Sequence, residues 1–356
     1  MLPYPVIVRA GERERIADTV RRLAADRRVA IITDSHVGPL YAARMAAATG
    51  ATADTTFTIP AGEQQKTRET WSRLTDDMLA RGLARDTVVI ALGGGVVGDV
   101  AGFVAATYMR GIPVIQVPTT LLAMVDASIG GKTGVDTSAG KNLVGAFHPP
   151  LAVVIDPEVL RTLPAEHLRA GFAEVVKHGV IADAQYFERA SAFAERWPLT
   201  AGAAQSLDDL IAIIQRSVEI KASIVARDER ESGVRRVLNF GHTIAHAVEA
   251  ATDFATLHGQ AVAIGIVAEA RLAERIGVAT TDTARVIERT CRAAGLPTAL
   301  PPVPVDTIIR FTRTDKKARS GRVEYALPKR IGEMAGADRG WTVPVEDSAV
   351  KEVLGA

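Results

Sequence analysis

The first 155 residues alternate short, β-branched apolar runs with segments whose pattern is typical of helices. The apolar runs cover residues 5–8, 29–33, 87–92, 114–117 and 153–155. Such alternation is typical of a parallel sheet covered by helices. We therefore expect an α/β domain over residues 1–155.

The pattern changes after Asp156 and Pro157. Long stretches rich in Ala, Leu, Ile and Arg follow at residues 207–226, 243–251 and 260–276, and they predict helices. A cluster of prolines near residue 302 ends this pattern, and residues 313–321 predict a charged loop before a short strand at 323–327. The second domain, residues 156–356, should be mostly α-helical. A single core stops growing at roughly 250 to 300 residues, so the length of 356 residues also favours two domains.

Charge and composition exclude several classes of partner. The chain has 42 Lys plus Arg and 41 Asp plus Glu, so no overall field attracts nucleic acid or a membrane surface. The single cysteine, Cys291, excludes an intrachain disulfide and fits a reducing compartment. The N-terminus lacks the apolar core of a signal peptide, and no apolar run approaches the ~20 residues of a membrane span. We expect a cytoplasmic protein with a small-molecule substrate, and no nucleic-acid or membrane partner.

A glycine-rich turn follows the apolar run at residues 88–92. Residues 93–99 read GGGVVGD and satisfy the G-x-G-x-x-G spacing, which lets backbone N–H groups approach a pyrophosphate. The acidic residue usual about 20 positions later is missing, but Asp34, at the end of an earlier run, is placed to bind ribose hydroxyls. The alternatives are a tight strand-to-helix turn for the glycines and a helix N-cap for Asp34.

Small residues and lysines gather in the next 25 positions, at residues 118–120 (PTT), 126–134 (DASIGGKTG) and 140–142 (GKN). This composition predicts an open backbone around an anion, with Lys132 and Lys141 as point charges. A solvated loop with two surface lysines is the alternative.

Carboxylate and imidazole groups with metal-ligand spacing occur in the second half. Glu174, Lys177 and His178 share one face of a helical stretch, for which a surface salt bridge is the ordinary explanation. His242 and His246 are one helical turn apart, and His258 follows. Thr replaces the Glu of an H-E-x-x-H motif, which disfavours a metalloprotease. A carboxylate with two imidazoles suits a catalytic zinc with one open position, whereas scattered capping or core roles are the alternative.

In combination, these motifs resemble 3-dehydroquinate synthases of the sugar phosphate cyclase superfamily over nearly the whole chain. The matching segments are residues 62–64, 93–99, 106–111, 118–120, 126–134, 141–142, 174–179, 221, 235–246 and 258–259. The resemblance implies an NAD-binding α/β domain over residues 1–155 and an α-helical metal- and substrate-binding domain over residues 156–356. It further implies an active site between them and a homodimer.

The resemblance also implies a role for individual residues. The implied zinc ligands, for which cobalt is a possible substitute, are Glu174, His242 and His258. The implied catalytic residues are Asp126, Lys132, Lys177 and His246. The implied substrate contacts are Arg110, which reaches the neighbouring subunit's phosphate site, and Asn142, Lys221, Arg235, Asn239, Lys316 and Lys317. The implied NAD contacts are Asp34, Glu63, Lys66, Gly95, Val96, Val97, Gly98, Asp99, Thr119, Thr120, Lys132 and Lys141.

By the same resemblance, 3-deoxy-D-arabino-heptulosonate 7-phosphate is converted to 3-dehydroquinate in the shikimate pathway, on the way to aromatic amino acids. The substrate is transiently oxidised by NAD, loses phosphate by β-elimination, is reduced again and closes by an intramolecular aldol step. Gln260, His178 and Ala61 depart from the usual Glu, Tyr and Asp of the family, and none of them is an implied ligand.

Three other functions remain to be distinguished. A metal-dependent polyol dehydrogenase would accumulate NADH. A cyclase acting on a neutral sugar phosphate would have no substrate carboxylate for Lys221 and Arg235 to bind. A cyclase acting on an amino analogue of the substrate would have one. A non-catalytic nucleotide-binding regulator would leave the histidines unexplained.

Overall fold

The structure is a computed structural model that describes residues 2–138, 140–196, 207–314, 318–319 and 322–355. By its internal contacts the chain divides into two compact units, Met1–Leu163 and Pro164–Ala356. Lys316 and Lys317 lie outside the described residues.

The first unit is built on a six-stranded sheet in which all neighbouring strands are parallel. The spatial order is β1-β8-β5-β4-β2-β3. The strands are β1 (Val6–Val8), β2 (Arg28–Asp34), β3 (Thr56–Ile59), β4 (Thr87–Gly93), β5 (Val114–Pro118) and β8 (Ala152–Ile155). The predicted α/β class and all five predicted strands are confirmed. Sequence reasoning missed β3, a four-residue edge strand in which threonines alternate with apolar residues.

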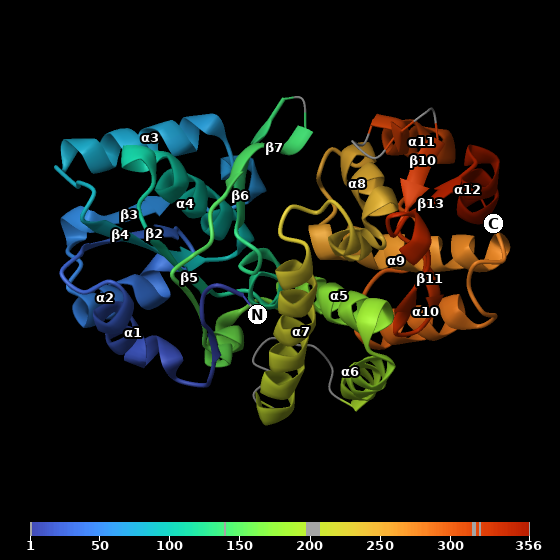
Figure 1. The fold of residues 1–356 in the computed structure, drawn as a ribbon, viewed down its shortest axis with the longest axis horizontal. Coiled ribbons are helices and arrows are strands. Elements are labelled where there is room, and N and C mark those ends of the chain that lie inside the picture. Colours follow the sequence, from blue (N-terminus) through green and yellow to red (C-terminus); the bar gives the residue numbers. More distant parts are fainter. Residues whose placement is uncertain (1, 139, 197–206, 315–317, 320–321, 356) are drawn as a thin grey trace. The chain divides into compact units, whose positions relative to one another are not determined.

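Helices cover both faces of this sheet (Figure 1). Helices α1 (Ile16–Leu23) and α2 (Gly38–Thr49) pack on one face, where their apolar residues meet Val29, Ile31 and the matching side chains of β4. Helices α3 (Arg68–Ala80) and α4 (Gly95–Thr107) pack on the other face against Ala30, Ile32 and their neighbours. Because β4 is buried along its whole length, it lacks the apolar–polar alternation of a half-exposed strand.

The stretch around Lys132 and Lys141 differs from the open loop predicted for it. Residues Ala123–Ala127 form a π-helical turn, and β6 (Lys132–Thr137) pairs with β7 (Gly140–Phe147) in an antiparallel hairpin. The glycines serve close packing here: a Cβ on Gly145 would lie 2.1 Å from the carbonyl oxygen of Thr133, and one on Gly102 of α4 would lie 2.4 Å from Cγ2 of Thr133. The open backbone predicted from sequence and the solvated loop considered as its alternative are both wrong for the hairpin, because its glycines bring backbones together.

The second unit is mostly helical, as predicted. Its helices are α5 (Ala165–Ala182), α6 (Ala184–Arg196), α7 (Leu207–Arg227), α8 (His242–Ala251), α9 (His258–Arg275), α10 (Thr283–Ala293), α11 (Val305–Thr314) and α12 (Asp347–Leu354). Its strands are β9 (Ala318–Arg319), β10 (Arg322–Tyr325), β13 (Val343–Val345), β11 (Pro328–Arg330) and β12 (Glu333–Met334). The loop predicted at residues 313–321 was wrong where the structure describes it. Arg313 belongs to helix α11, and residues 318–319 form β9.

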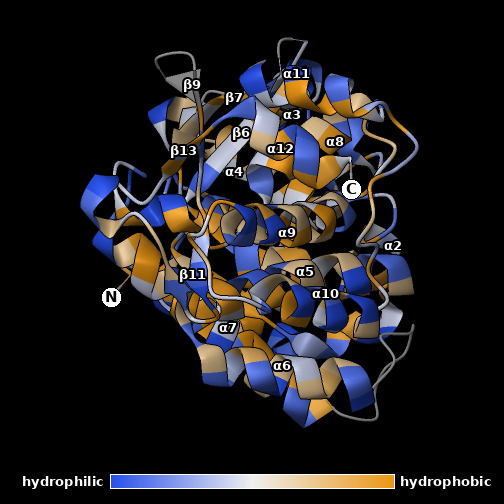
Figure 2. Cartoon of the chain, turned by 90° about the vertical axis from the view of Figure 1, so that its right-hand side faces the viewer, coloured by the Kyte–Doolittle hydropathy of each residue, from blue (hydrophilic) through white to orange (hydrophobic). Residues whose placement is uncertain are grey.

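Helix α9 lies at the centre of this unit and packs against α5, α8 and α10. It is buried on nearly all sides, whereas α10 carries hydrophilic and hydrophobic residues along its length (Figure 2). Despite this apolar character, none of the helices that the structure describes is long and apolar enough to cross a membrane.

Candidate active site

Three side chains with metal-ligating atoms converge from three helices of the second unit. Glu174 lies in the middle of α5, and His242 and His258 are the first residues of α8 and α9. Oε1 of Glu174 is 3.6 Å from Nε2 of His242 and 3.9 Å from Nε2 of His258. The ligand atoms of this group all lie within 4.8 Å of one another.

Glycines allow these three helices to approach so closely. A Cβ on Gly259 would lie 1.9 Å from the carbonyl oxygen of Ala170 in α5, and one on Gly265 would lie 1.9 Å from that of Gly241, the N-cap of α8. Real Cβ atoms never approach so near, so α9 rests directly on the backbone of both neighbours at these points. This close packing places His258 beside Glu174 and His242.

The geometry and burial of the group fit a divalent metal. Zinc binds His nitrogen and Glu oxygen at about 2.0–2.2 Å, which puts tetrahedral ligand atoms roughly 3.3–3.6 Å apart. Glu174 is fully buried, and neither of its oxygens accepts a hydrogen bond of acceptable geometry from the described residues. Its charge is compensated by an ion pair with Lys177. Because a buried carboxylate needs cations or hydrogen bonds, a metal ion would complete its environment.

His246 lies beside this group and is exposed. Its ring is perpendicular to that of His242 at 5.5 Å and lies 6.3 Å from that of His258. Sequence spacing alone left three histidines as candidate ligands. In the structure, the ring nitrogens of His242 and His258 lie near Glu174, and His246 belongs to no metal-competent group found among the described residues.

Buried cations occur in the same unit. Lys177 of α5, Lys221 of α7 and Arg235 of the 3₁₀ segment Val234–Asn239 are each less than a tenth exposed. The salt bridge between Glu174 and Lys177 is therefore a buried pair and not the surface pair considered from sequence. Their neighbour His178 is also buried, and its Nδ1 is 2.6 Å from Oγ of Ser217. Buried positive charge is costly unless it is paired, and Glu174 is the partner of Lys177.

The loop that carries Arg235 is organised by Asp228. Its carboxylate accepts the backbone N–H groups of Ser232, Gly233 and Arg235. Partial burial alone would raise the pKa of Asp228, but these hydrogen bonds outweigh burial and lower it. The guanidinium of Arg235 donates to the carbonyl oxygen of Glu229 at 2.5 Å.

Asn239 ends the same 3₁₀ segment. Its amide donates to Glu231 at 2.6 Å, so two of the predicted substrate-binding side chains are oriented by the loop before them.

In the first unit, the predicted cofactor residues follow neighbouring parallel strands. Asp34 ends β2, the glycine turn follows β4, and Thr119 follows β5. Strands β2 and β4 are adjacent, yet the chain continues from β2 to β3 on one side and from β4 to β5 on the other. Ligands of open α/β sheets bind at such a switch point, outside the carboxyl ends of the strands.

The glycine-rich turn has the packing expected of a phosphate-binding turn. Helix α4 begins at Gly95, and Val96, Val97, Gly98 and Asp99 form its first turns. A Cβ on Gly98 would lie 2.9 Å from Oε1 of Gln116 in β5, so glycine lets the helix pack tightly on the sheet. Thr119 is buried, its backbone N–H donates to Gly93, and Oγ1 of Thr120 accepts from the backbone of Ala123.

Charged residues flank this turn. Nζ of Lys66 is 2.6 Å from Oδ2 of Asp99, and Nζ of Lys141 is 3.3 Å from Oε1 of Glu63. Burial opposes the charge of Lys66, but Asp99 and Glu63 outweigh burial and raise its pKa, so this lysine stays cationic. One oxygen of Asp34 accepts the N–H groups of His36 and Val37 in the turn before α2. The N-cap of α2 is Val37, without a side-chain hydrogen bond, so the helix N-cap considered for Asp34 from sequence was wrong.

The remaining predicted residues of this unit lie on the hairpin and adjoining turns. Lys132 and Asn142 are exposed on β6 and β7, and Asp126 is half-buried in the π-helical turn. Arg110 is exposed at the end of the 3₁₀ segment Tyr108–Arg110. Met109 and Arg110 both have positive φ, of 50° and 67°, and such strain in non-glycine residues is common at functional positions.

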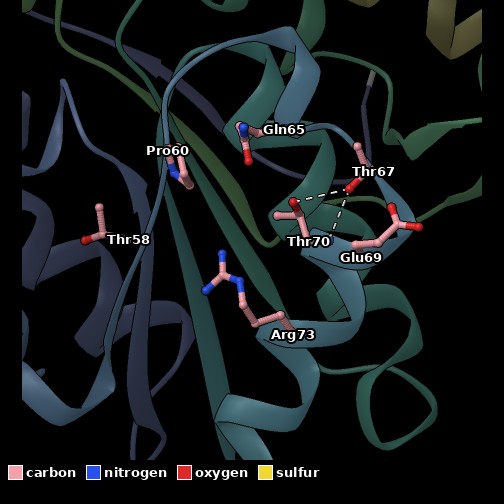
Figure 3. A pocket seen from close by; sticks show the side chains of 7 residues that line it. All are labelled: Thr58, Pro60, Gln65, Thr67, Glu69, Thr70 and Arg73. Carbon is pink, nitrogen blue, oxygen red and sulfur yellow. Dashed lines mark hydrogen bonds between the residues drawn. The ribbon is translucent and has the colours of Figure 1, made fainter.

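A surface pocket lies between β3, the segment after it and α3 (Figure 3). It is lined by Thr58, Pro60, Gln65, Thr67, Glu69, Thr70 and Arg73, and the guanidinium of Arg73 extends from α3 toward Thr58. Its lining includes none of the predicted site residues.

Sequence reasoning missed two buried carboxylates beside the histidines. Glu249 of α8 lies 3.4 Å from His258, and Glu269 of α9 accepts backbone N–H groups at the start of α8. The available signal was an acidic residue inside an apolar helical stretch, such as Glu269 within residues 261–270.

Comparison with known proteins places this chain in a family. Family models described as 3-dehydroquinate synthase N-terminal and 3-dehydroquinate synthase C-terminal match residues 56–170 and 171–318. The chain belongs to the 3-dehydroquinate synthase family. A curated 3-dehydroquinate synthase from Symbiobacterium thermophilum is 46% identical over 339 residues, covering 93% of this chain and 92% of that protein.

Two solved structures share the family's fold. One is 2-epi-5-epi-valiolone synthase from Streptomyces hygroscopicus subsp. jinggangensis with NAD⁺ and Zn²⁺ bound, at TM-score 0.87 and 31% identity over 99% of this chain and 96% of that one. The other is 2-deoxy-scyllo-inosose synthase complexed with carbaglucose-6-phosphate, NAD⁺ and Co²⁺, at TM-score 0.87 and 27% identity over 99% and 95%.

Proposed function

We propose that this protein is an NAD- and zinc-dependent 3-dehydroquinate synthase, a phosphate-eliminating lyase of the cytoplasm. Its substrate is 3-deoxy-D-arabino-heptulosonate 7-phosphate and its products are 3-dehydroquinate and phosphate. The proposal rests chiefly on the convergence of Glu174, His242 and His258 in a chain that is 46% identical to a 3-dehydroquinate synthase. By the same proposal, residues 1–155 bind NAD and residues 156–356 bind metal and substrate.

The proposed metal ligands are Glu174, His242 and His258, and the proposed cofactor site is the switch point with its glycine turn. When bound, NAD would supply a reversible hydride acceptor and zinc a Lewis acid for the hydroxyl to be oxidised. Because the hydride returns to the same substrate, the reaction is redox-neutral overall.

Arginine and lysine side chains bind the two anionic groups of the substrate in this proposal. Lys221 and Arg235 suit the carboxylate, because a guanidinium pairs with a carboxylate through two parallel hydrogen bonds. Lys132, Asn142 and Arg110 suit the phosphate, together with Lys316 and Lys317.

Lys177, His246 and Asp126 are the proposed proton-handling groups. The exposed imidazole of His246 lies beside the histidine pair and has ring nitrogens that can donate or accept a proton. Ring closure needs little beyond holding the enol and carbonyl in a reactive geometry.

Replacement of Arg110 tests the phosphate site. We propose that the protein is a homodimer and that the strained turn at Met109 and Arg110 presents the guanidinium to the phosphate site of the neighbouring subunit. The Arg110→Ala variant should keep the fold and raise KM for the substrate at least about ten-fold, as expected for loss of one charge-assisted contact. Exposed Arg68, at the start of α3, provides the control, since Arg68→Ala should leave KM unchanged. Unchanged kcat and KM for Arg110→Ala would remove this residue from the site.

Phosphate release with catalytic amounts of NAD tests the function as a whole. Purified enzyme is supplied with zinc, the heptulosonate phosphate and substoichiometric NAD, while phosphate and absorbance of NADH are followed. We expect stoichiometric phosphate without accumulation of NADH. Absence of phosphate release, together with turnover of a neutral or amino analogue, would point to a different cyclase, and net NADH from a simple polyol would point to a dehydrogenase.

A further inference from the structure

Glu249 is a buried carboxylate near the metal centre with no role in the reaction described above. It lies on α8, two helical turns after His242, and is 1% exposed. Burying a carboxylate costs free energy unless the group is paired or hydrogen-bonded. Its Oε2 lies 3.4 Å from Nδ1 of His258, the first residue of the next helix.

This contact bears on which nitrogen of His258 is free to bind a metal. A neutral imidazole carries one N–H, and its other nitrogen offers the lone pair that a metal requires. A carboxylate at Nδ1 favours the proton there, which leaves Nε2 unprotonated. Nε2 of His258 is the nitrogen that faces Glu174, at 3.9 Å from Oε1.

His242 has the same arrangement with a different partner. Its Nδ1 is 3.2 Å from the carbonyl oxygen of Phe240, and its Nε2 is 3.6 Å from Glu174. A backbone carbonyl can only accept, so it also favours the proton on Nδ1. Both imidazoles therefore have an acceptor behind them and direct Nε2 at the same carboxylate.

A short loop, residues 252–257, connects α8 to α9. Asp253 and Phe254 in that loop have positive φ, of 48° and 61°. Side-chain contacts between the helices supplement the loop: Glu249 reaches from α8 to the start of α9, and Glu269 of α9 accepts N–H groups of Gly241 and Ile244 at the start of α8. The first turn of each helix, which carries one histidine, is thus held by a carboxylate from the other.

We propose that Glu249 is a positioning residue for the metal ion, holding His258 in the orientation and tautomer that present Nε2. This inference rests on the metal site of the proposed function and deepens it. Partners of this kind behind ligating histidines raise metal affinity by about 10- to 100-fold. A purely structural role would instead affect the stability of the metal-free protein and leave affinity for the metal unchanged.

Two variants of Glu249 and one matched control separate these roles. Glu249→Met removes the acceptor at similar volume, whereas the amide oxygen of Glu249→Gln can still accept the N–H of His258. The control is Glu274→Met on α9, because Glu274 also joins two helices, by accepting the N–H of Ala284 in α10, and among the described residues it forms no salt bridge with a histidine. Zinc affinity is measured on metal-stripped protein by competition with a chelator. The absorption of bound Co²⁺ reports the ligand geometry, and thermal unfolding of the metal-free protein reports stability.

Glu249→Met should weaken zinc binding by about 10- to 100-fold and alter the Co²⁺ spectrum. Glu249→Gln should recover most of the affinity, and Glu274→Met should bind zinc as the wild type does. Wild-type affinity in Glu249→Met, or an equal loss of affinity in Glu274→Met, would overturn the role of Glu249 and leave the proposed function intact. A wild-type protein that binds no zinc would overturn the metal site itself.

Discussion

The His242→Ala variant should lose zinc and turnover together. His242 supplies one of three proposed ligands, and its Nε2 lies 3.6 Å from the buried carboxylate of Glu174. Loss of a residue that only supports a metal ligand weakens metal binding by up to about 100-fold. Removal of a direct ligand should weaken zinc binding by more than that. Metal content after dialysis and the rate of phosphate release at saturating substrate measure the two effects. Retention of full activity in a metal-free preparation would refute the zinc assignment.

Two other histidine variants make this result specific. His167→Ala, on an exposed position of α5, should keep both zinc and activity, which controls for loss of any histidine from the same unit. His246→Ala should keep zinc but lose activity, because His246 lies beside the ligand group without belonging to it. Loss of zinc in His246→Ala would instead show that the ligand set was wrongly chosen.

The sheet and the main helices could be predicted because their signals are local. The run at residues 87–92 is continuously apolar, since β4 is buried on both faces, and it is recognisable without any tertiary information. Strand β3 was missed because it is short and rich in Thr, and the β6–β7 hairpin was missed because glycines occur in both of its strands. The glycines of residues 126–134 suggested an open backbone, and only the pairing of β6 with β7 shows that Gly134 permits close approach of two backbones.

The candidate site was predictable in its residue types and not in its arrangement. Spacing along the chain left His242, His246 and His258 as candidate ligands, and only the resemblance to the family favoured His258 over His246. In the structure His258, which comes from a different helix, faces Glu174. Burial of Lys177 and Lys221 could not be read from sequence either, since charged residues are usually exposed. The supporting carboxylates are also invisible to motif reasoning, because Glu249 and Glu269 act across α8 and α9.

The Gly265→Ala variant should be strongly destabilised, although alanine is the better helix former. Alanine is favoured over glycine within a helix by about 1 kcal/mol, so without a collision the change would stabilise α9. Its Cβ would lie 1.9 Å from the carbonyl oxygen of Gly241, and neither backbone can yield without moving α8. Overpacking typically costs about 1–3 kcal/mol and occasionally more, and a collision between two backbones belongs at the upper end of this range, so it outweighs the helix propensity.

Because α8 begins at His242, the same displacement should also separate His242 from Glu174 and lower zinc affinity. Gly38→Ala is the matched control: Gly38 opens α2, and its Cβ would meet side chains instead of backbone, those of Thr33 at 3.2 Å and Thr58 at 3.9 Å. Thermal or urea unfolding of the two metal-free variants measures the difference in stability, and chelator competition measures zinc affinity. A Gly265→Ala protein as stable as the wild type would show that α8 and α9 can shift apart freely, and that close packing of their backbones does not fix the positions of the proposed ligands.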